Sequence, residues 1–344
     1  MDNIAHTLAG LALAEAGLKR RTALGTATLA IAANLPDIDA VMYLIGDGAD
    51  ALAFRRGWTH GPIAMLVLPA LLTMAMIGWR RVFGDKPGRR PSPINVGWLF
   101  VLALIGVLSH PLLDLMNTYG VRLLMPFSGR WFYGDALFIV DPWLWTTLGI
   151  GVLLARWRAR RLRDVSAGVG IVRRRSSRDL PTDHRWAPRP ALIALVLFAS
   201  YAMGMLLSGQ LGRGIVYRTA AGPRATRVMV GPVPVNPLRR DVVRAVGENY
   251  EVGTLTFGRQ ATYTPRGTID RGLDVPGLAA ASATPDGAKF LSWARFPFFT
   301  SRQVGDSLYV RMSDARYADE RGRGWASVEV TVPAPQSGVS ASYR

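Results

Sequence analysis

The most regular feature of this sequence is a series of apolar segments separated by short polar linkers. Four segments, residues 63–79, 96–116, 142–157 and 190–207, have about the length at which a helix crosses roughly 30 Å of hydrocarbon. We predict that each is a transmembrane helix. Two shorter apolar segments, residues 4–18 and 22–33, are rich in Ala and Leu and predict a helical hairpin that either spans the bilayer or dips into it.

After residue 208 the pattern changes to alternating β-branched and aromatic residues interrupted by Gly and Pro, as in RVMVGPVPVNP, YEVGTLTFG and ASVEVTV. This pattern is typical of a mainly antiparallel β domain. The predicted fold class is therefore a membrane α-helical bundle with a C-terminal, mainly β, extramembrane domain. The predicted divisions are a membrane-embedded domain at 1–158, a basic linker at 159–189, the last transmembrane helix at 190–208, the β domain at 209–333, joined to that helix by a Gly-containing linker at 209–214, and a disordered tail at 334–344.

Composition supports a membrane protein rather than a soluble nucleic-acid binder. The chain has 344 residues, 49% of them hydrophobic, and a formal net charge of +17. Soluble proteins that bind nucleic acid are rarely so apolar, so we expect no nucleic-acid partner. The chain has no cysteine, which excludes disulfides and thiolate metal sites. The first residues lack a cleavable-signal pattern, so we expect membrane insertion to depend on segments that remain in the chain.

The linkers after alternate apolar segments differ sharply in charge, which predicts an orientation. One set carries 19 basic residues, at 19–21, 80–90 and 156–189, whereas the intervening set carries four, at 55, 56, 122 and 130. Basic loops stay on the cytoplasmic side. We therefore expect a multi-pass protein of a bacterial-type inner (cell) membrane, with Met1, the loop after residue 33, the loop at 118–141 and the β domain on the extracytoplasmic side.

Three of the four histidines fall within or beside apolar segments of the first 110 residues, where ionisable groups are costly and mark functional sites. His6 lies four residues after Asp2, and Asp114 lies four residues after His110, so each pair shares one face of a helix. A His/Asp pair at this spacing is also common as a structural hydrogen bond. His60 directly precedes a predicted span. With the orientation above, all of these residues are expected at the extracytoplasmic face, which favours a shared metal ion.

The motif NLPDID ends the second apolar segment. Pro36 disfavours helical backbone at Leu35, and in extended backbone Asp37 and Asp39 would point to the same side. The alternative is a capped turn. An imidazole and carboxylate set without thiolate suits Zn, with Mn or Fe as alternatives, and one or more ions. A metal-bound water becomes a nucleophile near neutral pH, which is hydrolytic chemistry.

The order of the motifs DNIAHT, NLPDID, RRGWTHGP and SHPLLDLMNTYG resembles the YdjM-like family of inner-membrane-bound metal-dependent hydrolases. The resemblance extends through about residue 143, with further similarity in VPVNPLR and FLSWARFPFF of the β domain. It implies a metal-dependent hydrolase whose ligands are His6, Asp37, Asp39, His60, His110 and Asp114. The arrangement is more loosely similar to zinc-dependent phospholipase C, where helical His and Asp residues hold a cluster that cleaves phosphoesters.

Other polar residues of the outer loops have predicted supporting roles. Asp135 and Asp141 are candidates for a catalytic base or a further ligand, although Asp141 before Pro142 is equally suited to cap a helix. Arg55 and Arg56 are candidates for binding an anionic group of the substrate or lipid headgroups. Further candidate hydrogen-bond donors near the metal are Asn34, Thr59, Asn117 and Tyr119.

The sequence thus predicts a membrane-bound hydrolase of a phosphoester or another ester, with membrane lipid as a partner and candidate substrate. Two alternatives from other classes stay open: a non-catalytic metal-binding scaffold or sensor, and a cation transporter. A transporter needs polar residues near the bilayer midplane and in the cytoplasmic half, whereas these cluster at one end. The sequence does not define the substrate or the oligomeric state.

Overall fold

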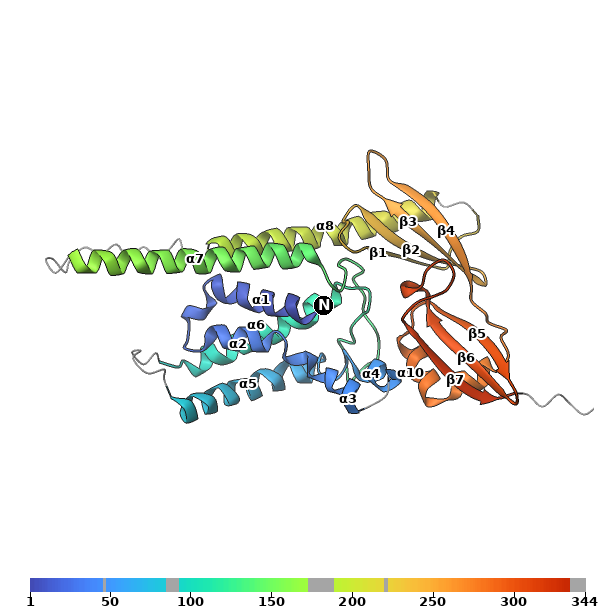
Figure 1. The fold of residues 1–344 in the computed structure, drawn as a ribbon, viewed down its shortest axis with the longest axis horizontal. Coiled ribbons are helices and arrows are strands. Elements are labelled where there is room, and N and C mark those ends of the chain that lie inside the picture. Colours follow the sequence, from blue (N-terminus) through green and yellow to red (C-terminus); the bar gives the residue numbers. More distant parts are fainter. Residues whose placement is uncertain (46–47, 85–92, 173–188, 220–221, 335–344) are drawn as a thin grey trace, which may run out of the picture. The chain divides into compact units, whose positions relative to one another are not determined.

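The computed structural model describes residues 1–45, 48–84, 93–172, 189–219 and 222–334 (Figure 1). The N-terminal half is helical and the C-terminal part carries two antiparallel sheets, which confirms the predicted fold class. The chain forms two compact units. The first comprises Met1–Ile38 and Arg56–Leu206, and the second comprises Asp39–Arg55 and Leu207–Arg344.

The first two helices form the predicted hairpin. Helix α1 (Asn3–Glu15) begins at Asp2, whose carboxylate accepts hydrogen bonds from the backbone N–H groups of residues 4 and 5, as an N-cap does. After a short 3₁₀ turn (Leu18–Arg20), α2 (Gly25–Ala32) returns alongside α1. Asn34 Nδ2 donates to Thr7 Oγ1 at 2.9 Å, which ties the end of α2 to the start of α1.

Among the described residues, three helices are long and apolar enough to cross a membrane: α5 (Pro62–Phe83), α6 (Val96–Leu115) and α8 (Arg189–Thr219). Only 28% of the apolar window of α5 and of α8 is buried, as expected for helices that face lipid. A fourth span is formed if α2 is counted together with the segment Leu35–Ile45, to which it is joined at a 46° bend. The predicted segment 142–157 forms the first half of α7 (Pro142–Val172), which is not among these candidates because arginines follow it closely.

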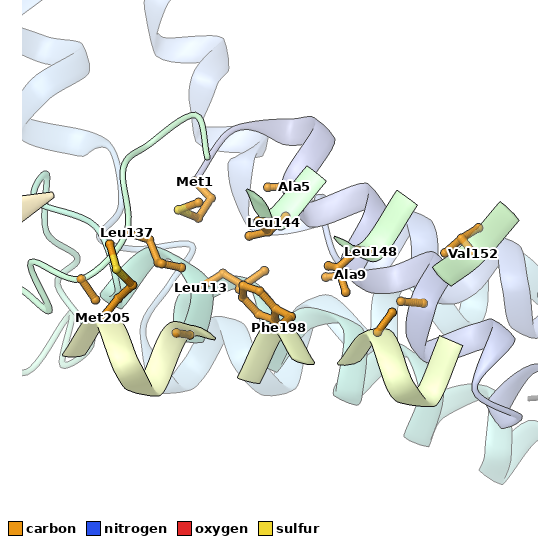
Figure 2. Packing of buried hydrophobic residues seen from close by; sticks show 14 residues of the cluster. Met1, Ala5, Ala9, Leu113, Leu137, Leu144, Leu148, Val152, Phe198 and Met205 are labelled. Atoms are coloured by element: carbon orange, nitrogen blue, oxygen red, sulfur yellow. The ribbon is translucent and has the colours of Figure 1, made fainter. Parts of the chain in front are cut away.

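A hydrophobic core of buried side chains joins four helices of the first unit (Figure 2). Ala5 and Ala9 of α1 lie against Leu144 and Leu148 of α7, and Phe198 of α8 lies in the same cluster. Leu113 brings α6 into this core one residue before Asp114. Helix α1, which carries His6, and helix α6, which carries His110 and Asp114, are therefore held in place by this packing.

Small residues allow close packing between α6 and α2. A Cβ atom at Gly106 would lie 2.5 Å from Ala32 Cβ and 3.2 Å from the carbonyl oxygen of Leu29. Small residues at such contacts let helix backbones approach closely in membranes. This packing places the end of α2 beside the C-terminal half of α6.

Two predicted boundaries are wrong. Residues 159–172 of the predicted basic linker continue α7, and residues 209–214, predicted as a Gly-rich linker, continue α8 to Thr219. Isolated glycines do not end a helix when apolar packing continues past them, and Val216 of α8 is fully buried in a cluster with strand residues of the second unit. The rest of the basic linker, 173–188, and the tail from 335 lie outside the described residues.

The C-terminal domain contains two antiparallel meanders. The first sheet consists of β1 (Arg227–Pro232), β2 (Arg239–Val246), β3 (Asn249–Thr256) and β4 (Thr262–Asp270) in sequential order. The second consists of β5 (Pro297–Val304), β6 (Ser307–Asp314) and β7 (Ser327–Pro333), with a 3₁₀ turn (Ala315–Tyr317) after β6. Buried residues of both sheets, including Val243, Val252 and Phe298, share one core.

The second unit also includes an N-terminal segment that the sequence did not assign to it. Residues 39–55 carry α3 (Met42–Ile45) and α4 (Gly48–Phe54), and α4 packs against α10 (Pro285–Trp293), which follows α9 (Leu278–Ala283). Lys289 Nζ of α10 forms an ion pair with Asp50 Oδ1 of α4. The segment Asp39–Arg55 therefore belongs to the second unit, whereas the residues before and after it belong to the first.

Candidate metal centre

Helix α6 contributes His110 and Asp114, one turn apart on one face, as the sequence predicts. Both side chains are fully buried. His110 Nδ1 lies 2.7 Å from the carbonyl oxygen of Ala33, which can only accept, so Nδ1 carries the proton. His110 Nε2 is thereby left as a lone-pair donor, the arrangement that metal-binding histidines use.

Asp37 reaches the same place from a 3₁₀ helix (Leu35–Val41). Its Oδ1 lies 3.6 Å from His110 Nε2. The extended backbone expected for NLPDID is wrong: α2 ends at Ala32, and the chain continues in 3₁₀ turns of three residues each. Residues two apart in such turns do not point to one side, so Asp37 and Asp39 diverge.

His60 comes from the tight turn before α5. Gly61 Cα faces the carbonyl oxygen of Met125 so closely that a Cβ atom there would lie 1.9 Å from this oxygen. Thr59, one of the predicted hydrogen-bond donors near the metal, places its Oγ1 2.9 Å from His60 Nδ1. Burial lowers the pKa of His60 well below its usual value, with the neighbouring His110 as a further cause. A neutral imidazole is the form that binds metal.

Ligand atoms of Asp37, His60, His110 and Asp114 all lie within 4.8 Å of one another, and all four residues are buried. Asp114 Oδ2 lies 3.5 Å from His60 Nε2 and 3.7 Å from His110 Nε2. Two ligands at about 2.1 Å from a tetrahedral ion are about 3.4 Å apart, so these separations fit one divalent cation. Two imidazoles with two carboxylates are a donor set that Zn, Mn or Fe accepts. We refer to these residues as the four-residue group.

Asp39 has a different neighbour. It is buried in the second unit, where its Oδ1 lies 3.5 Å from Arg55 Nε, and the Arg55 guanidinium lies over the ring of Tyr43. The predicted ligand role of Asp39 and the predicted substrate role of Arg55 therefore stay predictions.

Two further predicted acidic residues have structural contacts. Asp141 caps α7: its Oδ1 accepts the backbone N–H groups of Trp143 and Leu144 at 3.0 Å, and Tyr201 donates to Oδ2. Of the two roles that the sequence allowed, the structure supports capping. Asp135 is buried at a positive φ of 51°, in a loop held to the end of α6 by hydrogen bonds to the carbonyl oxygen of Met116. Catalytic roles for both stay predictions.

Arg56 contacts the four-residue group directly. Its side chain is buried, with Nε 3.0 Å from Asp114 Oδ2 and Nη1 3.0 Å from Asn117 Oδ1, and its guanidinium lies 4.7 Å from the Tyr119 ring centre. Asn117 Oδ1 also accepts the backbone N–H groups of Tyr119 and Gly120. Arg56 thus connects the turn before α5 to α6 and to the loop after it.

Sequence reasoning missed Arg122. Its backbone N–H donates to the carbonyl oxygen of Arg56 at 2.8 Å, and its buried guanidinium lies over Trp131. A Cβ atom at Gly57 would lie 2.7 Å from Arg122 Nη2, so the glycine allows this guanidinium to lie against the turn that leads to His60. The glycines in RRGWTHGP are the only sequence signal of this close approach.

His6 of α1 lies against the four-residue group. Its ring stacks on His110 with the ring centres 3.7 Å apart, and its Nε2 lies 3.4 Å from Asp114 Oδ1. Asp2, its predicted partner, instead caps α1 and accepts a hydrogen bond from Trp145 Nε1. The structure therefore brings His6 to the same place as the α6 pair, without Asp2.

Fold and site together define a class: a multi-helix membrane protein with a buried His and Asp group that could hold a metal ion, located where several helices end. The chain belongs to the YdjM inner membrane protein family, whose model matches residues 1–208. No curated protein and no solved structure shows significant similarity to the chain. The match covers the helical part, so the resemblance of the β domain to the family stays a prediction.

Proposed function

We propose that this protein is a membrane-bound, metal-dependent hydrolase of a phosphoester or another ester, with a membrane lipid as the candidate substrate. The observation that carries the proposal is the four-residue group, in which two imidazoles and two carboxylates converge without cysteine. A divalent ion held there, with Zn preferred over Mn or Fe, would lower the pKa of a bound water toward neutrality.

The protein groups around the site support this chemistry. His110 is held in one tautomer by the Ala33 carbonyl, and Thr59 orients His60, so both imidazoles are fixed before any ligand binds. Arg56 adds a buried positive charge at Asp114, which favours an anionic substrate group over a neutral one. By charge distribution, the site and the C-terminal domain are extracytoplasmic, where lipid headgroups are accessible.

The test is hydrolysis by the full-length protein purified in detergent and loaded with Zn. Phospholipids and chromogenic phosphoesters and carboxyl esters are the substrates, and His110→Ala is compared with Ser109→Ala. Ser109 precedes His110 on α6 and donates only to a backbone carbonyl among the described residues. We expect product from the parent and Ser109→Ala but not from His110→Ala. If the metal-loaded parent formed no product from any of these substrates, the proposal that the protein is a hydrolase would be rejected.

One observation favours a second candidate function, a cation transporter. Asp37 is the third residue of the apolar segment Leu35–Ile45, just after the bend from α2, and broken helices of this kind form ion sites in transporters. Metal uptake into proteoliposomes distinguishes the two functions, since a hydrolase without transport activity accumulates no metal. The third alternative, a non-catalytic scaffold or sensor, predicts bound metal with neither turnover nor uptake.

A further inference from the structure

The two carboxylate oxygens of Asp114 face different sets of nitrogen atoms. Oδ2 faces Arg56 Nε at 3.0 Å, His60 Nε2 at 3.5 Å and His110 Nε2 at 3.7 Å. Oδ1 faces His6 Nε2 at 3.4 Å and also contacts the amino group of Met1. The carboxylate is fully buried, so neither oxygen is hydrated from bulk solvent. The four-residue group accounts for the Oδ2 side alone.

Ordinary packing does not explain why the polar side chain of His6 is buried. The side chain is completely buried, and among the described residues neither ring nitrogen has a hydrogen-bond partner. A buried polar group without a partner costs about 1–3 kcal/mol, so such groups call for an explanation. The ring stacks on His110 at an interplanar angle of 15°, and its Nε2 lies 3.4 Å from Asp114 Oδ1.

The Met1 amino group contacts Oδ1, so this oxygen faces a position that a cation can occupy. An ammonium and a divalent cation are both attracted to such a carboxylate oxygen, and an imidazole lone pair beside it favours the metal. A divalent ion bound at this position displaces the ammonium from Oδ1.

We propose that Asp114 bridges two divalent cations, the first held on its Oδ2 side by the four-residue group and the second held on its Oδ1 side by His6. The first ion is the one in the proposed function, on which this inference rests, and the second ion is added by the inference. Two ions that share a carboxylate lie about 3.5–4 Å apart and form the two-metal clamp used for phosphoryl groups. A paired site of this kind fits a phosphoester substrate.

The two sites differ in affinity. The second ion has to displace an ammonium and binds beside an ion of like charge, whereas the first has two carboxylates and two imidazoles. Metal therefore fills the sites in sequence, and the second equivalent binds more weakly. Removal of His6 affects only that second equivalent.

The test is a Mn²⁺ titration of full-length protein stripped of metal in detergent, with bound metal determined by mass spectrometry and electron paramagnetic resonance recorded at each step. The parent and Ser109→Ala are expected to bind two ions per chain in two phases and to show exchange-coupled spectra at saturation. His6→Ala is expected to bind one ion with the six-line spectrum of isolated Mn²⁺. His6→Gln retains a polar side chain of similar size and gives the same result if the fold is intact.

The outcomes separate this inference from the proposed function. Two coupled ions in both His6 variants, or a single ion in the parent and in the variants alike, would overturn the second site and leave the first intact. Loss of all metal from a monodisperse His6→Gln protein would also overturn it, because the two sites would not be separate. A parent that binds no metal would reject the proposed function itself.

Discussion

The substitution Gly106→Ala tests whether the packing of α2 on α6 sets the geometry of the metal centre. The added Cβ would lie 2.5 Å from Ala32 Cβ, whereas non-bonded carbon atoms lie about 3.5–4.0 Å apart. The two helices must therefore separate by about 1–1.5 Å at this point. Overpacking of this kind costs about 1–3 kcal/mol of stability.

The displacement also reaches the site, because His110 lies one turn after Gly106. A separation of about 1 Å lengthens the 2.7 Å contact between His110 Nδ1 and the Ala33 carbonyl oxygen beyond the usual hydrogen-bond limit. Loss of such an orienting contact lowers metal affinity by about 10- to 100-fold. We therefore expect Gly106→Ala to lower both the thermal unfolding midpoint and the Zn affinity.

The assay is thermal unfolding in detergent followed by tryptophan fluorescence, together with Zn competition against a chelating dye. Gly78→Ala on α5 is the matched control, since nothing lies within 4 Å of a Cβ atom there and alanine favours the helix. If Gly106→Ala gave the same midpoint and the same Zn affinity as Gly78→Ala, the proposed link between helix packing and the site would be refuted.

Three further predictions use the same purified protein or intact cells. A cysteine at Gly129 should react with an impermeant thiol reagent in intact cells and one at Arg20 should not; the reverse pattern would overturn the orientation derived from loop charge. Arg56→Lys keeps the charge but loses the contacts with Asp114 and the Asn117 loop, so Zn affinity should fall by about 10- to 100-fold, and unchanged affinity would remove Arg56 from the site. Lys289→Asp should increase proteolysis within α4, and a second change, Asp50→Lys, should restore protection; equal cleavage of all three proteins would show that this ion pair does not hold α4 on α10.

The sequence predicted the helical bundle, the β domain and the residues that now lie together because each left a local signal. Charged or imidazole groups in apolar segments are costly, so His110 and Asp114 were conspicuous, and charge in the linkers assigned them to one face. Hydropathy and the alternation of apolar and polar residues were sufficient to predict the fold class, because transmembrane helices are long apolar runs whereas half-buried strands alternate with a period of two residues.

What could not be predicted depends on tertiary contacts. The residues around Pro36 are compatible with several kinds of turn, so the 3₁₀ backbone that carries Asp37 and Asp39 could not be chosen from local sequence. Likewise, nothing in residues 39–55 indicates that α4 packs on α10 rather than on the helical unit, because the partner lies over 200 residues away. The roles of Arg122, Gly57 and Gly61 depend on the close approach of the turn before α5 to the loop after α6, which the sequence does not show.

The central claim is that the four-residue group binds a divalent metal ion. The most direct measurement is the metal content of the detergent-purified parent protein, reconstituted with Zn and freed of excess, compared with His110→Ala and Ser109→Ala. The account predicts tightly bound Zn in the parent and in Ser109→Ala, and loss of this Zn in His110→Ala, because His110 Nε2 faces both Asp37 and Asp114. A folded parent that retains no Zn, or a His110→Ala protein that retains the parent's full content, would contradict it.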